Sequence, residues 1–256
     1  MPRALFLADL HCLSDVGLVD PNYTFNSHDL SRSYQLSLNK TQSVIYDEYQ
    51  NMIEEVGQVQ QTYLIGDIIE GANLHGSGVG VQNTAINEQQ EMAFGLIDQV
   101  KCSNYAGVPG SGYHVGHNPK NEMEIIRKLS QKYHTKFTFG DDLTHETGGK
   151  IFHLRHVQPF RKNWAQRCNA ALEEIKLVAH DPSFIKDSLH FMVRGHCHYW
   201  HPYIRYCGIE YISVPGWKGR DEFIKLKSTV KPDLGYVVVD IDNKGRYDIW
   251  ERIFHV

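Results

Sequence analysis

The sequence predicts a mixed α/β protein, α+β in its detail, built as a four-layer αββα sandwich of two mixed β-sheets flanked by helices. In its first half, short apolar runs of strand length alternate with amphipathic segments of helix length, the order of parallel strands joined by helices. From about residue 189, strand-like runs follow one another with only turns between them, which is typical of antiparallel pairing. We predict one domain that spans residues 1–256.

The first unit is predicted to be strand, helix, strand. Residues 4–8 (ALFLA) and 62–65 (TYLI) are apolar runs, and the acidic residues Asp9 and Asp67 follow them. Between the two runs, apolar residues recur at spacings of four, three, one and three, which is one face of a helix. These residues are Ile45, Tyr49, Met52, Ile53 and Val56. The unit therefore predicts two buried parallel strands with a crossover helix.

Three more helices are predicted, at residues 92–100, 121–133 and 163–179. The inward face of the last is expected to carry Ala165, Cys168, Ala171, Leu172, Ile175 and Val178. Between the first two helices, residues 105–116 (YAGVPGSGYHVG) are rich in glycine and predict a loop.

The remaining strands are predicted from shorter patterns. Residues 135–140 and 150–156 indicate strands around a polar turn that contains glycine, and residues 191–193 indicate a buried strand. Two hairpins follow, at residues 203–214 around Cys-Gly and at residues 236–254 around Asp-Asn-Lys-Gly. We predict the segments with the weakest pattern to be mobile, namely residues 14–32, 71–90 and about 216–233.

Composition narrows the classes of function. No run of about 18 apolar residues exists that could cross a membrane, and the first eight residues lack the organisation of a signal peptide. A net charge of -4 argues against an extensive basic face that would hold nucleic acid. Five scattered cysteines favour reduced thiols over a disulfide framework. We therefore expect a cytoplasmic protein that does not contact membranes.

Acidic, hydroxyl and imidazole side chains stand at strand ends or in the glycine-rich loop, where side chains leave the core. They are Asp9, His11, Asp67, Ser111, His114, His156, His196 and His198. Carboxylates and imidazoles together suit divalent ions such as Mn, Zn or Fe. These groups exceed the needs of one four-coordinate ion, and a carboxylate can bridge two ions. We therefore expect two divalent metal ions, an arrangement that suits phosphate chemistry.

The motifs "DLH", "GDIIEG", a glycine-rich loop ending in His, a His at a strand end and "GHCH" occur in that order between residues 9 and 198. This series resembles the calcineurin-like metallophosphoesterase superfamily. The resemblance implies a hydrolase with the αββα fold that acts on phosphate esters. It also implies that the first ion is held by Asp9, His11 and His198, that Asp67 bridges, and that His156 and His196 hold the second ion. His114 would assist the leaving group, so that Asp67 and His114 are the expected catalytic residues.

The glycine-rich block departs from that resemblance. The family pattern reads Gly-Asn-His, with the asparagine as a ligand of the second ion, whereas this sequence reads "GSGYH". The ligand position then falls to Ser111, to a backbone carbonyl or to water, and Asn104 is a poorer candidate. We expect weaker affinity for the second ion as a consequence.

Several neighbours of the motifs have two interpretations. Glu70 and Asn73, with His75, follow the bridging Asp67 closely and are expected to orient ligands or to touch substrate. His153 is the rival of His156, and His117 is the rival of His114. Arg161 and Arg194 are the cations nearest the motifs, and they serve either as phosphate contacts or as ordinary ion-pair residues.

The leading hypothesis is a metal-dependent phosphoesterase, with a phosphomonoester or phosphodiester as its substrate and a water activated by two ions as its nucleophile. Nucleic acid is a possible substrate, which would make the protein a nuclease, but the negative net charge favours a small molecule. The alternative from another class is a binding scaffold that keeps the fold without hydrolysis. The missing asparagine favours the scaffold, and six retained ligand candidates oppose it.

Overall fold

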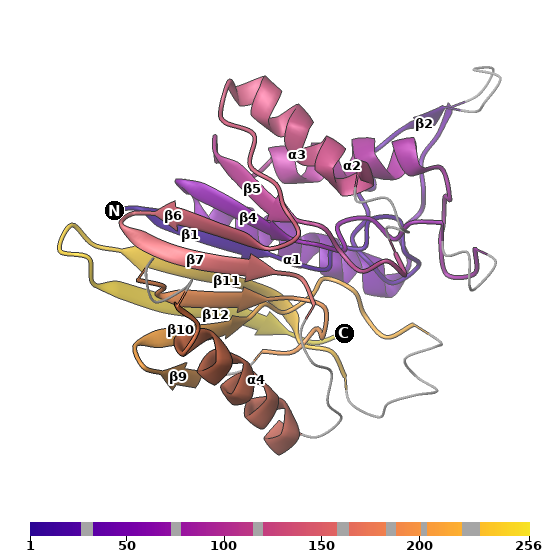
Figure 1. Ribbon diagram of the computed structural model, residues 1–256. Coiled ribbons are helices and arrows are strands. Elements are labelled where there is room, and N and C mark those ends of the chain that lie inside the picture. The colour runs from indigo at the N-terminus through magenta and orange to yellow at the C-terminus, as the bar shows by residue number, and fades with distance from the viewer. Residues whose placement is uncertain are drawn as a thin grey trace.

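Two five-stranded sheets face each other in the computed structural model, and helices cover both outer faces (Figure 1). The structure describes residues 1–26, 33–72, 78–114, 120–157, 164–182, 188–200, 204–221 and 231–256. In spatial order, the first sheet contains β12 (Tyr247–Phe254), β11 (Leu234–Ile241), β1 (Arg3–Leu7), β4 (Gln61–Ile65) and β5 (Tyr105–Val108). The second contains β6 (Leu143–Thr147), β7 (Lys150–Arg155), β8 (Phe191–Arg194), β10 (Ile209–Ser213) and β9 (Ile204–Tyr206).

Both sheets are mixed, as predicted. β1, β4 and β5 are parallel neighbours, whereas β11 and β12 pair antiparallel at one side. In the second sheet β7, β8 and β10 are parallel, and β6 and β9 are antiparallel edges. A separate short pair is formed by β2 (Phe25–Asn26) and β3 (Ser33–Tyr34).

The helices are α1 (Lys40–Val56), α2 (Ile86–Asp98), α3 (Lys120–Tyr133) and α4 (Trp164–Ala179). In Figure 1, α1, α2 and α3 lie on the side of the first sheet and α4 lies on the side of the second. α1 begins with a capping box, because the Asn39 side chain accepts a hydrogen bond from the Gln42 amide and the Gln42 side chain accepts one from the Asn39 amide. Among the described residues, no helix is both long and apolar enough to cross a membrane.

Alternation along the strands builds a core on each side of a sheet. From β1, Ala4 and Phe6 point between the sheets, and the Phe6 ring lies 5.5 Å from that of Phe152 in β7. Leu5 and Leu7 belong to the separate core beneath the helices of the first sheet. Because β1 is buried on both faces, it reads as an unbroken apolar run, and the predicted four-layer sandwich is confirmed.

Several predicted elements are confirmed within a few residues of their expected bounds: both hairpins, the helices at 121–133 and 163–179, and the first strand-helix-strand unit. Cys207 and Gly208 both have positive φ, 48° and 84°, which suits the tight turn between β9 and β10. α2 begins at Ile86, six residues before the prediction. On α4, Ala171 and Ile175 are buried as predicted, but Ala165 is exposed.

One loop prediction and one strand prediction were wrong. The start of the glycine-rich stretch, Tyr105–Val108, is β5 rather than loop. Glycine is present there because α3 packs closely on the strand, and a Cβ at Gly107 would lie 2.3 Å from Ile126 Cδ1. The predicted strand at 135–140 contributes only an isolated bridge at Phe139, and the true strand is β6, Leu143–Thr147. β6 is an edge strand whose exposed and half-buried residues alternate, so its sequence is too polar to stand out.

Candidate metal centre

The site lies where the parallel strands end, and both sheets contribute to it. Asp9 follows β1, Asp67 follows β4, His156 follows β7 and His196 follows β8. Backbone hydrogen bonds join these turns: the Asp9 amide donates to the Gly66 carbonyl at 2.9 Å, and the Gly195 amide donates to the His156 carbonyl at 3.1 Å. The sandwich therefore brings residues from distant parts of the chain to one edge.

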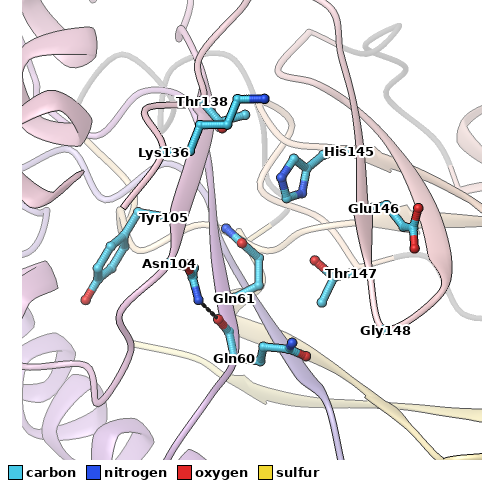
Figure 2. A pocket seen from close by; sticks show the side chains of 10 residues that line it. All are labelled: Gln60, Gln61, Asn104, Tyr105, Lys136, Thr138, His145, Glu146, Thr147 and Gly148. Carbon is cyan, nitrogen blue, oxygen red and sulfur yellow. Dashed lines mark hydrogen bonds between the residues drawn. The ribbon is translucent and has the colours of Figure 1, made fainter. Parts of the chain in front are cut away.

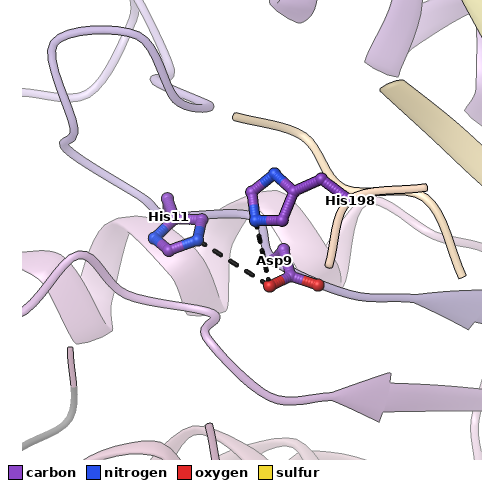
Figure 3. A group of neighbouring side chains, drawn as sticks. All are labelled: Asp9, His11 and His198. Atoms are coloured by element: carbon purple, nitrogen blue, oxygen red, sulfur yellow. Dashed lines mark ion pairs between the residues drawn. The ribbon is translucent and has the colours of Figure 1, made fainter. Parts of the chain in front are cut away.

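A first group of possible metal ligands consists of Asp9, His11 and His198 (Figure 3). Asp9 Oδ1 lies 3.2 Å from His198 Nε2 and 3.8 Å from His11 Nε2. Asp9 Oδ2 accepts a hydrogen bond from the His196 amide at 2.9 Å. Within the described part of the chain, the fully buried Oδ1 has no hydrogen-bond partner. A buried carboxylate oxygen without a donor, facing two imidazole nitrogens, fits a divalent cation.

A second group consists of Asp67, His156 and His196. His156 Nδ1 donates to the Ile65 carbonyl at 2.6 Å, which directs Nε2 toward Asp67 Oδ2 at 3.0 Å. His196 Nδ1 lies 4.0 Å from the same oxygen. His11, Asp67 and His114 form a third combination. In each of the three, the possible ligand atoms lie within 4.8 Å of one another, so Asp67 belongs to two of the three groups. Asp67 therefore lies within reach of His11 and His114 as well as of His156 and His196.

Ser111, one of the candidates for the open ligand position, contacts Asp67. Its amide donates to Asp67 Oδ1 at 2.7 Å, and its hydroxyl lies 3.2 and 3.1 Å from the two carboxylate oxygens. Tyr113 stands directly before His114, at the asparagine position of the Gly-Asn-His pattern, and it is 46% exposed. Of the alternatives considered, the structure places the Ser111 hydroxyl beside the second group.

The backbone of the site adopts rarely populated conformations. Five candidate ligands have φ in the left-handed region, which is uncommon for residues other than glycine: Asp9 at 54°, His11 at 46°, Asp67 at 48°, His196 at 72° and His198 at 50°. Strain of this kind gathers at functional sites and persists only where the surrounding structure imposes it.

Several glycines make close approaches to the candidate ligands, among them Gly110 and Gly216. A Cβ at Gly110 would lie 2.1 Å from Asp67 Oδ1, and one at Gly216 would lie 2.7 Å from His198 Nδ1. No side chain could be accommodated at either place without a shift of the ligand itself. The packing around the centre is therefore tight on both the Asp67 and the His198 side.

The surroundings of Asp9, Asp67 and His11 favour the deprotonated side chains, which are the forms that bind cations. Burial alone would raise the pKa of Asp9, but the neighbouring His198 outweighs it and the pKa falls to about 2. Burial likewise opposes the ionisation of Asp67, yet His156 holds the pKa of that carboxyl well below its usual range. Burial, with the Lys218 ammonium, lowers the pKa of His11 to about 4. At neutral pH both aspartates are carboxylates, and His11 is a neutral imidazole.

His156 is the exception to this pattern. Burial lowers its pKa, but the Asp67 carboxylate outweighs burial and raises the pKa to about 10. A cation held by Nε2 would therefore displace a proton from this ring.

Glu70 is 2% exposed and lies on the Nδ1 side of His11 and His114. Its Oε2 is 2.8 Å from His11 Nδ1, and its Oε1 is 3.5 Å from His114 Nδ1. Although burial opposes ionisation, His11 lowers the pKa of Glu70 to about 2. A carboxylate at Nδ1 leaves His11 Nε2 directed toward Asp9, the arrangement that orients metal-binding imidazoles.

The alternative residues named from the sequence are not members of the three groups. His153 contacts Asp142 and Arg194. Arg194 is 1% exposed and its Nε lies 2.9 Å from Glu174 Oε1, so it serves as an ion-pair residue in the interior. Asn73, His75, His117 and Arg161 lie outside the described residues.

The sequence interpretation missed Glu122 of α3. This 1% exposed carboxylate accepts hydrogen bonds from the Ile68 amide and, at 2.6 Å, from the Gly110 amide. Burial and the nearby Asp67 raise its pKa to about 8. Its signal was its spacing, since Glu122 lies on the same helix face as the buried Ile125, Ile126 and Leu129.

The sequence interpretation also missed Lys218. It lies in a stretch predicted to be mobile, but it is 4% exposed and contacts Glu70. Nothing in the sequence pattern marked it, because its partner is distant along the chain.

A polar hollow of about 270 Å³ lies away from these groups, at the beginnings of β4 and β5 and at the turn between β6 and β7 (Figure 2). Gln61, Tyr105, His145 and Thr147 are among the residues that line it. None of the possible metal-binding groups found among the described residues lies there. The candidate metal centre is thus at the opposite ends of these strands.

No protein-family model and no curated protein sequence matches the chain. Solved structures do match its fold. A dimetal phosphatase from Danio rerio is 11% identical, with 99% of this chain and 98% of that chain covered and a TM-score of 0.50. The purple acid phosphatase PPD1 from yellow lupin is 13% identical with a TM-score of 0.52, and 98% of this chain matches 51% of that longer one.

At these identities the similarity establishes the fold alone. The chain has a metallophosphoesterase-like fold, with aspartate and histidine groups that could hold metal ions at one edge of its sheets.

Proposed function

We propose that the protein is a metal-dependent phosphoesterase that hydrolyses phosphomonoesters or phosphodiesters. The observation that carries the proposal is the pair of three-residue groups at one sheet edge, with Asp67 in the second and also within reach of His11 and His114. The fold, which the chain shares with a dimetal phosphatase and a purple acid phosphatase, supports it.

Two divalent cations, Mn, Zn or Fe, are the proposed cofactors. Asp9, His11 and His198 would hold the first, and His156 and His196 would hold the second, with Ser111 beside it. Asp67 would bridge the two. Bound in this way, the cations would neutralise phosphoryl oxygens and make a water acidic enough to serve as the nucleophile.

His114 is the proposed leaving-group residue. Its side chain is 13% exposed, and its Nδ1 lies 3.1 Å from the Glu70 carbonyl and 3.5 Å from Glu70 Oε1. A proton held at Nδ1 between these two acceptors leaves Nε2 for the substrate. When Nε2 also carries a proton, the ring can donate a hydrogen bond or that proton to the departing alkoxide oxygen and keep the proton at Nδ1.

The proposed substrate is a small phosphate ester. With a net charge of -4, the chain has no overall excess of cations for binding a polyanion. Nucleic acid is the second candidate substrate class. Assays of both kinds of substrate side by side distinguish the two.

The test begins with protein stripped by a chelator and reloaded with Mn²⁺, Zn²⁺ or Fe²⁺. Chromogenic phosphomonoesters and phosphodiesters and single-stranded DNA are then assayed side by side. We expect metal-dependent hydrolysis of a chromogenic ester, and faster cleavage of DNA would shift the assignment to a nuclease. Wild-type protein that holds fewer than one ion per chain and hydrolyses none of these substrates would refute the proposal and favour a binding scaffold.

A further inference from the structure

Lys218 is a buried cation at the wall of the candidate metal centre. It follows β10, and its side chain is 5% exposed. Its Nζ lies 2.9 and 3.1 Å from the two oxygens of Glu70 and 3.2 Å from Asp221 Oδ2. An ammonium group is rarely buried to this degree unless carboxylates compensate for the water it has lost.

The backbone next to Lys218 contacts the centre as well. The Trp217 amide donates to the Asp9 carbonyl at 2.9 Å. Gly216 is close enough to His198 that an added Cβ would lie 2.7 Å from Nδ1. Residues 216–218 therefore touch three parts of the centre, namely Asp9, His198 and Glu70.

Lys218 determines how Glu70 can lie. Because Nζ contacts both oxygens, the carboxylate is held at both ends rather than by a single hydrogen bond. Those oxygens are the ones that face His11 Nδ1 at 2.8 Å and His114 Nδ1 at 3.5 Å. One ammonium group thus fixes a carboxylate that contacts both a proposed metal ligand and the proposed leaving-group residue.

We propose that Lys218 is a positioning residue of the candidate centre, which holds the Glu70 carboxylate in the orientation that aligns His11 and His114. The inference rests on the proposed function for its kinetic consequence and on the geometry alone for its consequence on metal binding. The contacts of Nζ argue against a direct role in binding phosphate, because Nζ lies against two protein carboxylates, the buried Glu70 and the half-buried Asp221.

The experiment compares Lys218→Met, Lys218→Arg and Glu70→Gln with wild type, and uses Arg3→Met as a matched control. Arg3 makes a comparable two-contact ion pair, with Asp240 at 2.7 and 2.9 Å, at the other end of β1. Three quantities are measured on folded protein: Mn²⁺ affinity by calorimetry, kcat and KM with a chromogenic ester, and the melting temperature.

We expect Lys218→Met to lower kcat and Mn²⁺ affinity by about 10- to 100-fold with little change in KM, the usual cost of losing a group that orients metal ligands. Lys218→Arg should recover part of both losses. Arg3→Met should change only the melting temperature. The double variant Lys218→Met/Glu70→Gln should be no worse than Lys218→Met, because both changes act on one interaction.

Wild-type kcat and Mn²⁺ affinity in Lys218→Met, or an effect confined to KM, would overturn the inference. If wild type binds Mn²⁺ but hydrolyses nothing, the proposed function fails, while the affinity comparison still decides the role of Lys218. Should Lys218→Met not fold, Asp221→Asn loosens the same ammonium group more mildly, and unchanged Mn²⁺ affinity in that folded variant would count against the inference.

Discussion

The two groups of the candidate metal centre differ in how completely the protein encloses them. In the first group, Asp9 is fully buried and His11 is 1% exposed. In the second, the His196 side chain is 36% exposed, and the neutral Ser111 hydroxyl lies 3.1 Å from Asp67 Oδ2. A buried, oriented ligand set binds a cation more tightly than an open one with a weaker donor. We therefore expect the first group to hold its ion more tightly than the second.

The largest effect should come from the residue between the groups. Asp67→Asn removes the negative charge and one oxygen donor from the bridge, so turnover should fall to background while the fold persists. Steady-state assays with circular dichroism check both points, and Asp98→Asn, at a half-buried aspartate of α2 that contacts Lys132 and Tyr133, serves as the control. Wild-type rates in Asp67→Asn would remove this residue from the bridge.

His114 should affect rate more than metal content. His114→Ala is expected to lower kcat by about 100- to 10,000-fold, the range for loss of a general acid or base, with bound metal unchanged. Metal analysis of the same samples provides the comparison. Equal loss of metal in His114→Ala and in His196→Ala would show that the division of roles between them is wrong.

His11 and His196 test the difference between the groups directly. His11→Ala should remove the tightly held ion, whereas His196→Ala should remove the weakly held one and leave about one ion per chain. Mn²⁺ titrations of the two variants measure this. Identical titration curves for the two variants would mean that the groups do not differ as proposed.

Ser111 should show the smallest effect on metal binding. Ser111→Ala removes a neutral donor beside Asp67, so we expect a loss of several-fold in the affinity of the weaker ion and none in that of the tighter one. Ser111→Asn should tighten the weaker ion. A uniform change in both affinities would argue that Ser111 acts only by supporting Asp67.

Glu122 should affect the stability of the fold, and not the difference in affinity between the two ions. In Glu122→Gln, an NH2 group takes the place of one acceptor oxygen. The backbone N–H of either Ile68 or Gly110 then faces another donor and loses its acceptor. A buried amide without an acceptor costs about 1–3 kcal/mol in the free energy of unfolding. Urea denaturation measures this, and an unchanged midpoint would show that the contacts with Glu122 are dispensable.

The four-layer fold could be predicted because its central strands are buried on both faces and read as plain apolar runs. The candidate site residues could be singled out for a related reason. Asp9 and Asp67 interrupt those runs at their ends, and parallel strands bring such ends together. β5 was missed because Gly107 serves helix packing, and β6 because an edge strand does not need apolar residues.

Lys218 and Glu122 show where sequence reasoning ends. Each is an ionisable residue with a partner distant along the chain: Glu70 lies 148 residues from Lys218, and Ile68 lies 54 residues from Glu122. Burial of such a side chain is decided by the tertiary structure. A pattern of neighbours along the chain therefore cannot distinguish it from a surface residue.

The most direct test of the central proposal is a crystal structure of the Mn²⁺-loaded protein with anomalous scattering data. We predict two adjacent peaks, one bounded by Asp9, His11 and His198 and the other by His156 and His196, with Asp67 between them. A single peak, or peaks away from these side chains, would contradict the proposal.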